Sequence, residues 1–168
     1  VDNMRFTLSG EWTPDNTVYW KDPETKADLY AYYPYGKPED VTAYPFAVNT
    51  DQSTAKGFWS SDFMWGKRTS VAPTLEAVNI ETERLFSNAL VYVEAGTGIS
   101  ASELAQADIE VAICNVKTSA VINLATGKAT AVGEVGTITP WKVDGCYRAM
   151  VVPQRVTSET KLITVRVN

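Results

Sequence analysis

The sequence contains no histidine, and this absence removes the commonest components of an enzyme site. Without an imidazole, the chain lacks the usual general base at neutral pH and the most frequent metal ligand. Neither a Ser-His-Asp nor a Cys-His catalytic set can be built. The two cysteines, Cys114 and Cys146, lie outside any CxxC motif, so a zinc site would need carboxylates in unusual number. We therefore expect a protein without enzymatic activity, metal or cofactor.

Clustered positive charge and long apolar runs are also missing. The net charge is -5 and no run of four basic residues occurs, so the chain lacks the Lys and Arg clusters that bind nucleic acid phosphates. No apolar stretch reaches the roughly 18 residues that a membrane-spanning helix needs. The chain opens on Val1 rather than Met, and we expect it to be a processed or shortened form.

A few carboxylate pairs are the remaining candidates for catalysis. Glu81 and Glu83 share one face if their segment is a strand, and Asp108 and Glu110 do the same. Glycosidases place two carboxylates roughly 5 to 9 Å apart across a cleft. A spacing of two on a solvated strand face is far more typical of surface charge. The segment Gly96-Thr97-Gly98 lacks the remaining residues of a phosphate loop and is interpreted as a turn from a strand into a helix.

The two cysteines leave two alternatives open. They form a single disulfide if the chain folds in an oxidising compartment, or they are two unrelated small residues on strands. By alternation, Cys114 shares a face with Glu110, and Cys146 shares a face with Arg148. We therefore expect both cysteines to be partly exposed.

Five tryptophans raise the possibility of a carbohydrate-binding surface, which is the alternative to a structural role. Trp59 and Trp65 lie in or near loops, where exposed rings could form a platform that stacks on sugars. The alternative, which the sequence favours, is that these rings fill a core or cover sheet edges, because large aromatic side chains are usually mostly buried. The five residues are Trp12, Trp20, Trp59, Trp65 and Trp141.

Short strand patterns dominate the chain. Runs rich in β-branched and aromatic residues recur at intervals near a dozen residues, which predicts an all-β antiparallel sandwich or barrel over residues 1–168 as a single domain. The segment Ser100-Ala101-Ser102-Glu103 has the form of a capping box, so we expect one short helix near residues 100–107. The expected strands are 5–9, 17–20, 27–33, 46–48, 74–80, 85–94, 109–113, 120–124, 128–132, 147–152 and 161–167.

Two local connections can be predicted in more detail. We expect strands 17–20 and 27–33 to form a hairpin around the charged turn at 21–25. A second hairpin should turn at Ala125-Thr126-Gly127, where glycine supplies a positive φ. The polar segment 51–58 is expected to be a loop.

Several blocks along the chain form an ordered set, which runs from about Glu11 to Val167. The blocks are Trp12-Thr13-Pro14, Tyr19-Trp20, Asp28-Leu29-Tyr30-Ala31-Tyr32-Tyr33-Pro34-Tyr35, Asp51-Gln52-Ser53, Ser61-Asp62-Phe63-Met64-Trp65-Gly66, Leu90-Val91-Tyr92-Val93-Glu94-Ala95-Gly96, Asn123-Leu124-Ala125-Thr126-Gly127 and Val151-Val152-Pro153-Gln154. In this order and spacing the chain resembles the fimbrillin-like proteins, a type V pilus-related family of Gram-negative Bacteroidia. Thr82 and Arg84 depart from the family pattern, which has Phe-x-His there, and this departure should change either local packing or a surface patch.

The resemblance implies an exported pilus stalk or tip subunit at the outer membrane or cell surface, with a transthyretin-like β-sandwich and a precursor that is often lipid-anchored. It implies that other pilus subunits bind by strand addition, in which a leading strand is removed and a neighbour's strand replaces it. Surface glycans or proteins of the host or of bacteria are the other partners it suggests. From the resemblance, we expect the chain to be shorter than its relatives at both ends. We expect the working surface at an open strand edge or in the loops of 36–66.

Overall fold

The structure is a computed structural model that describes residues 3–168. It is mostly β, and its strands form antiparallel sheets that do not close into a barrel, so the expected all-β sandwich is confirmed. The strands are β1 (Phe6–Ser9), β2 (Glu11–Pro14), β3 (Ala27–Tyr33), β4 (Tyr44–Ala47), β5 (Met64–Val71), β6 (Glu83–Arg84), β7 (Ser87–Val91), β8 (Ile109–Asn123), β9 (Lys128–Ile138), β10 (Trp141–Val143), β11 (Cys146–Val151) and β12 (Ile163–Val167). The helices are α1 (Ala55–Trp59) and α2 (Ala101–Gln106).

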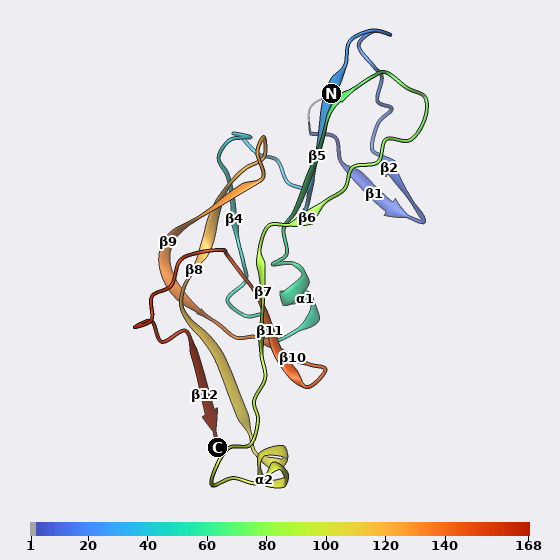
Figure 1. Ribbon diagram of the computed structural model, residues 1–168. Helices are drawn as coiled ribbons and strands as arrows, with labels where there is room; N and C mark the ends of the chain where they lie inside the picture. The colour runs from blue at the N-terminus through green and yellow to red at the C-terminus, as the bar shows by residue number, and fades with distance from the viewer. Residues whose placement is uncertain (1–2) are drawn as a thin grey trace.

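The long strand β8 organises the main body of the molecule (Figure 1). β9 pairs with β8 along one edge, while β12 and β4 pair with successive parts of the other edge. A second sheet, ordered β10-β11-β7, packs against this one. The turn between β8 and β9 contains Gly127 with φ of 73°, as expected, and a Cβ there would clash with the Trp65 ring.

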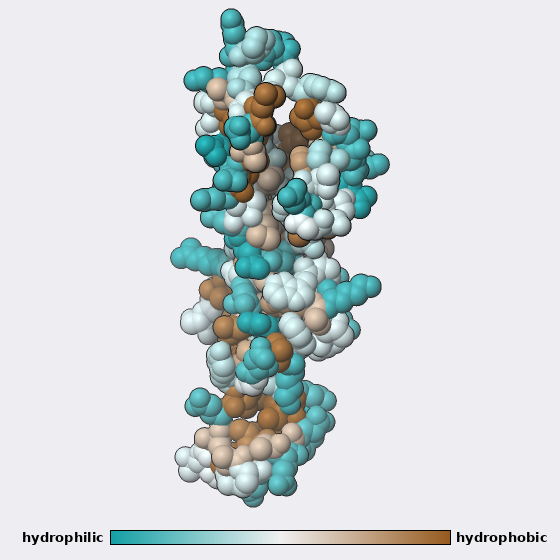
Figure 2. Space-filling model, turned by 90° about the vertical axis from the view of Figure 1, so that its right-hand side faces the viewer, coloured by the Kyte–Doolittle hydropathy of each residue, from teal (hydrophilic) through white to brown (hydrophobic). Residues whose placement is uncertain are grey.

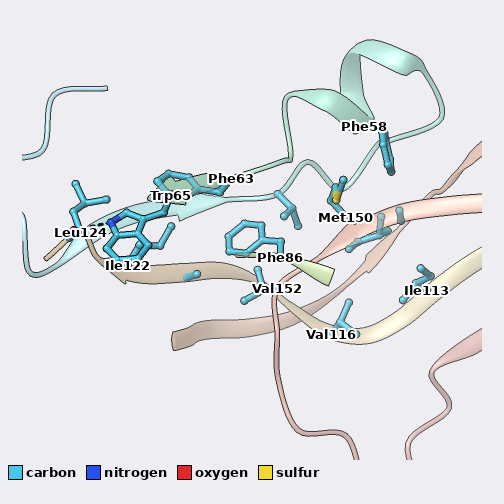
Figure 3. Packing of buried hydrophobic residues seen from close by; sticks show 14 residues of the cluster. Phe58, Phe63, Trp65, Phe86, Ile113, Val116, Ile122, Leu124, Met150 and Val152 are labelled. Carbon is cyan, nitrogen blue, oxygen red and sulfur yellow. Dashed lines mark hydrogen bonds between the residues drawn. The ribbon is translucent and has the colours of Figure 1, made fainter. Parts of the chain in front are cut away.

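The core of the sandwich is built around an aromatic side chain. Phe63 is fully buried, and four rings surround it with centroid separations of 5.0 to 6.3 Å. These separations are those of favourable edge-to-face and offset aromatic pairs. Figure 3 shows Phe63 and Phe86 facing the aliphatic side chains of β8 and the end of β11. The four rings belong to Tyr32, Tyr44, Phe46 and Phe86.

A buried glutamine connects the two sheets. Gln52 has no exposed surface, and its side-chain amide makes both backbone hydrogen bonds of Met150, accepting from its N–H at 2.8 Å and donating to its C=O at 2.9 Å. The Gln52 amide also donates to the carbonyl of Asn49 at 3.0 Å. The amide therefore bonds to β11 as a strand would, at a point beyond the last residue pair of β10 with β11.

A narrower part of the molecule extends away from the core at the N-terminal side (Figure 1). Here β3 pairs with β5, and β1 pairs with β2 in a separate hairpin. The Trp20 indole N–H donates to the carbonyl of Thr74 at 2.8 Å and connects the intervening loops. Tyr32 bonds to Asn3 and to the carbonyl of Gly36, which fixes the end of β3.

Two predicted strands are wrong, and one helix was missed. Residues 17–20 and 74–80 form no strand, and the partner of β3 is β5 from far along the chain, so the predicted hairpin around 21–25 does not exist. Residues 51–58 were expected to be a loop, yet α1 begins inside them, with the Thr54 hydroxyl accepting from Gly57 N–H. The helix at α2 is confirmed with its capping box.

The long strand β8 joins two segments that were expected to be separate strands. The predicted strands 109–113 and 120–124 are parts of one strand of 15 residues. Its register against β9 shifts twice between Cys114 and Ser119, where irregular pairing bends the strand. Asn115, at the first irregularity, has φ of 58°. This irregular stretch, whose apolar alternation is weak, explains why the pattern suggested a break.

The molecule is elongated and exposes an unusually large surface (Figure 2). Its accessible surface is 11450 Å², whereas a compact monomer of this mass exposes roughly 8,200 Å². Hydrophobic side chains gather in hollows towards both ends of the molecule in the view of Figure 2. The sandwich is therefore well covered at its centre and incompletely covered towards its ends.

Candidate interaction surface

The last strand, β12, has an apolar face that is only partly covered by the rest of the molecule. Its sequence alternates, so that Ile163, Val165 and Val167 point to one face while Thr164 and Arg166 point to the other. The three apolar side chains are 46 to 47% exposed. On the polar face, Arg166 lies 3.3 Å from the carboxylate of Glu110. Strand β12 is thus amphipathic, but its apolar side is left half open.

Side chains on the same face of the sheet are buried on β8 and half-exposed on β12, although the two strands are neighbours. Ile163 pairs with Ile113 and Val165 pairs with Val111, so each pair lies on the same face of the sheet. Ile113 and Val111 are 2% and 6% exposed, in contrast to their partners. Adjacent strands are only about 4.8 Å apart. The second sheet therefore covers β8 and stops short of β12.

The outer edge of β12 also carries unpaired backbone groups. In the ladder with β8, the Cys114 N–H donates to the Leu162 carbonyl at 2.7 Å, and the Asn168 N–H donates to the Asp108 carbonyl at 2.9 Å. Because hydrogen-bonded and non-hydrogen-bonded pairs alternate in an antiparallel ladder, residues 163, 165 and 167 direct their N–H and C=O groups away from β8. No strand within residues 3–168 pairs with that edge. The same three residues thus offer apolar side chains and free backbone groups.

A small apolar cluster lies beside this edge. Val91, Val111 and Tyr147 are buried together, with Val93 and Ile109 partly buried against them. They come from the ends of β7, β8 and β11, near the end of the molecule that α2 closes (Figure 1). The Tyr147 hydroxyl donates to the Ile109 carbonyl at 3.0 Å and holds the two sheets together there. Buried apolar side chains that are held by this hydrogen bond therefore lie next to the open edge.

The carboxylate pairs considered for catalysis are exposed. Glu81, Glu83, Asp108 and Glu110 all lie on the solvent-facing surface, and Glu110 pairs with Arg166. Within residues 3–168, no group of three His, Cys, Asp or Glu side chains is placed to hold a metal ion. In the same range, no helix is both long enough and apolar enough to cross a membrane.

The tryptophans do not form the sugar platform that Trp59 and Trp65 suggested. Trp65 is only 6% exposed, and its indole N–H donates to the Leu124 carbonyl at 2.7 Å. Trp59 is 46% exposed, and the guanidinium of Arg84 lies 5.9 Å from the centroid of its ring. Trp12, on β2, is 62% exposed. The two rings therefore cannot stack on one ligand.

The two cysteines are free, and only one of them is partly exposed. Cys114 is half-buried, with its sulfur 3.6 Å from the Thr164 hydroxyl. Cys146 is buried, contrary to expectation, and its sulfur lies 3.4 Å from the Val143 carbonyl. Arg148 is itself half-buried, with its guanidinium 5.6 Å from the centroid of the Phe58 ring, so sharing a face with Arg148 does not make Cys146 exposed.

Arg84 has a structural role in the segment that follows α1. Its Nε donates to the Asp62 carboxylate at 2.7 Å, and Asp62 is 3% exposed. An unpaired carboxylate in such a site would be costly, because burial removes its hydration. Arg84 thereby holds the segment after α1 against β6.

Comparison with known proteins decides the family. The profile of the fimbrillin-like family matches residues 1–168. The chain belongs to the fimbrillin-like family. Among curated proteins, none matches the chain.

Two solved structures share the fold of this fimbrillin-like chain. One is a candidate cell adhesion protein from Bacteroides uniformis ATCC 8492, with 23% identity and a TM-score of 0.73 over 93% of this chain and 60% of that one. The other is a candidate cell adhesion protein from Bacteroides ovatus ATCC 8483, with 17% identity and a TM-score of 0.72 over 95% and 61%. The chain thus spans about three-fifths of the length of either structure.

Proposed function

We propose that this protein is a non-enzymatic subunit of a surface fimbria that joins its neighbours by strand addition at the free edge of β12. Membership of the fimbrillin-like family supports a pilus or adhesion role. The descriptions of the two related structures point to cell adhesion as well. We also propose that residues 1–168 act as one unit, exported to the cell surface, from a lipid-anchored precursor.

The single observation that carries the strand-addition proposal is the coincidence on β12 of free backbone groups and exposed apolar side chains. An added antiparallel strand would exchange hydrogen bonds with residues 163, 165 and 167. Its residues directly opposite these three would place their side chains on the apolar face. The donor strand should therefore carry an apolar residue at every second position.

Burial of this face supplies the driving force. Half-exposed Ile163, Val165 and Val167 would become buried between the donor and the cluster around Val111. Burying apolar surface stabilises by about 25 cal/mol per Å². The added backbone hydrogen bonds contribute roughly 1 kcal/mol each, net of the water that they displace. The two terms act together because the same residues supply both.

Two single substitutions test the proposal on neighbouring residues. Val165→Lys places a charge on the apolar face, whereas Thr164→Lys places the same charge on the polar face of the same strand. A synthetic peptide of about seven residues with alternating Val and Thr serves as the donor. We expect the peptide to raise the melting temperature of the wild type and of Thr164→Lys by several degrees, and to leave Val165→Lys unchanged. Equal shifts in both variants, or no shift in the wild type, would contradict strand addition at β12.

A further inference from the structure

A second open surface lies at β9, which pairs with the edge of β8 opposite to β12, and it carries positive charge. A shallow pocket of about 440 Å³ is formed between the start of β9 and the segment that follows β11. Three cationic side chains line it, and no carboxylate does, although the protein as a whole is acidic. The lining residues are Lys117, Lys128, Ala129, Thr130, Ala131, Pro153, Gln154 and Arg155.

The three cations of this pocket have no ionic partner within the part of the chain that the structure describes. Ion pairs are found there at Arg84 with Asp62 and at Arg166 with Glu110, and at neither Lys117, Lys128 nor Arg155. Cations without an ionic partner attract an anionic ligand, and several cations that face one ligand attract it together. The pocket is therefore complementary to negative charge.

The lining of the pocket favours an extended peptide segment over a sugar as the ligand. Four consecutive residues of β9, from Lys128 to Ala131, line it. Successive side chains of a strand point to opposite faces. Four consecutive residues can therefore line the same pocket only where the pocket lies along the edge of the strand. The edge of β9 away from β8 has no partner strand within residues 3–168. The lining contains no aromatic ring on which a sugar could stack.

The three cations come from different elements, and the backbone positions of two of them can be compared along the direction of β9. Lys117 on β8 pairs with Val135, which is seven residues along β9 from Lys128. At the rise of an extended strand, that interval is roughly 23 Å. Arg155 directly follows Gln154, which is bonded to Lys117, and so belongs to the Lys117 end. The spacing suits an extended segment of about seven residues with carboxylates at both ends.

Gln154 fixes one wall of the pocket. Its side-chain amide accepts from the Lys117 N–H at 2.8 Å and donates to the Lys117 carbonyl at 2.9 Å. A further bond to the Val152 carbonyl at 3.0 Å holds the segment after β11 in place. The wall is thus formed before any ligand arrives, which reduces the entropy lost on binding.

From this pocket we infer a second docking site, in which an extended acidic peptide segment of a partner protein pairs with the free edge of β9 and places its carboxylates against Lys117, Lys128 and Arg155. The site is distinct from the β12 edge. Its occupant is selected by charge, whereas the occupant of β12 is selected by apolar side chains.

The test measures fluorescence anisotropy of a fluorescein-labelled heptapeptide of alternating Glu and Thr. We expect saturable binding to the wild type that is at least tenfold weaker for the variant Lys117→Ser/Lys128→Ser/Arg155→Ser. The matched control, Lys21→Ser/Lys26→Ser/Lys37→Ser, removes the same charge from exposed positions outside the pocket and should bind as the wild type does. Equal weakening by both triple variants would overturn the proposal, because it would show attraction to overall charge only.

Two further arms identify the kind of ligand. A peptide with N-methyl groups at alternate amides cannot donate to the β9 edge on that side and should bind at least fivefold more weakly. An N-methylated peptide that binds as well as the parent would overturn the pairing with β9. A sulfated polysaccharide that binds through the three cations while the acidic peptide does not would overturn the peptide assignment. Melting curves of both triple variants check folding, and the single variant Arg155→Ser replaces the triple if the triple unfolds.

Discussion

The centre of the sandwich and its β12 end share the strand β8 but differ in how fully their side chains are covered. At the centre, Ile122 of β8 is fully buried between two sheets, and Gln52 closes the remaining gap beside β11. At the other end, Ile163 lies one strand away from the buried Ile113 and is 47% exposed. The same apolar alternation therefore builds a closed core in one place and an open edge in the other. Within residues 3–168, the centre is closed on both faces, and the β12 edge is not.

Replacing an isoleucine by alanine in each of the two regions gives the largest expected difference in unfolding free energy. Ile122→Ala should cost about 4 kcal/mol of unfolding free energy, because it leaves a cavity that the packed core cannot close. Ile163→Ala should cost below about 1 kcal/mol, because its side chain is already half in water. Urea unfolding of both variants measures the two costs. Similar costs would mean that β12 is as well covered as the centre.

A second pair compares two glutamines with the same hydrogen-bonding pattern. Gln52→Ala should cost about 3 kcal/mol, because the N–H and C=O of Met150 are left without partners in a fully buried site. Gln154→Ala removes the equivalent bonds to Lys117, but at a partly buried site where water replaces them, so about 1 kcal/mol is expected. Urea unfolding again gives both values. If Gln154→Ala proves the more damaging, the pocket wall is more tightly packed than its burial indicates.

The smallest expected effect concerns α2, at the same end of the molecule as the open edge. The Ser100 hydroxyl and backbone N–H donate to Glu103 and hold the pKa of that carboxyl below its usual value. A lowered pKa means that the folded state favours the ionised carboxylate, so this stabilisation is present at neutral pH and is lost as the pH falls through the lowered pKa. Ser100→Ala should therefore speed amide exchange in α2 alone at neutral pH. The difference between variant and wild type should shrink in acid.

Local signals in the sequence predicted those parts of the fold that local signals decide. The capping box at Ser100 gave α2, and Gly127 gave the turn between β8 and β9, because each depends on hydrogen bonds or backbone angles within a few residues. The predicted pairing of 17–20 with 27–33 failed, since the partner of β3 lies in β5 and the aromatic pattern does not specify a distant partner. Helix α1 was missed because its segment is short and polar, although Thr54 is a residue type that is favoured at the N-cap of a helix.

The candidate site could be anticipated only in general terms. The alternation of residues 161–167 predicted a strand with one apolar face. Whether that face is covered depends on how far the second sheet extends, which is a tertiary property that alternation does not contain. The basic pocket could not be predicted either, since Lys117, Lys128 and Arg155 come from separate segments of the sequence and only the fold brings them to the lining of one pocket.

Amide hydrogen exchange of β12, followed residue by residue by NMR, shows whether the outer edge of this strand is open and whether it accepts an added strand. In the free protein, the amides of residues 163, 165 and 167 should exchange quickly, while those of 164 and 166, bonded to β8, should exchange slowly. Addition of the alternating Val and Thr peptide should slow exchange at the three odd-numbered residues and leave the even-numbered ones unchanged. Odd-numbered amides that are already protected in the free protein, or that stay fast at saturating peptide, would contradict an open edge at β12.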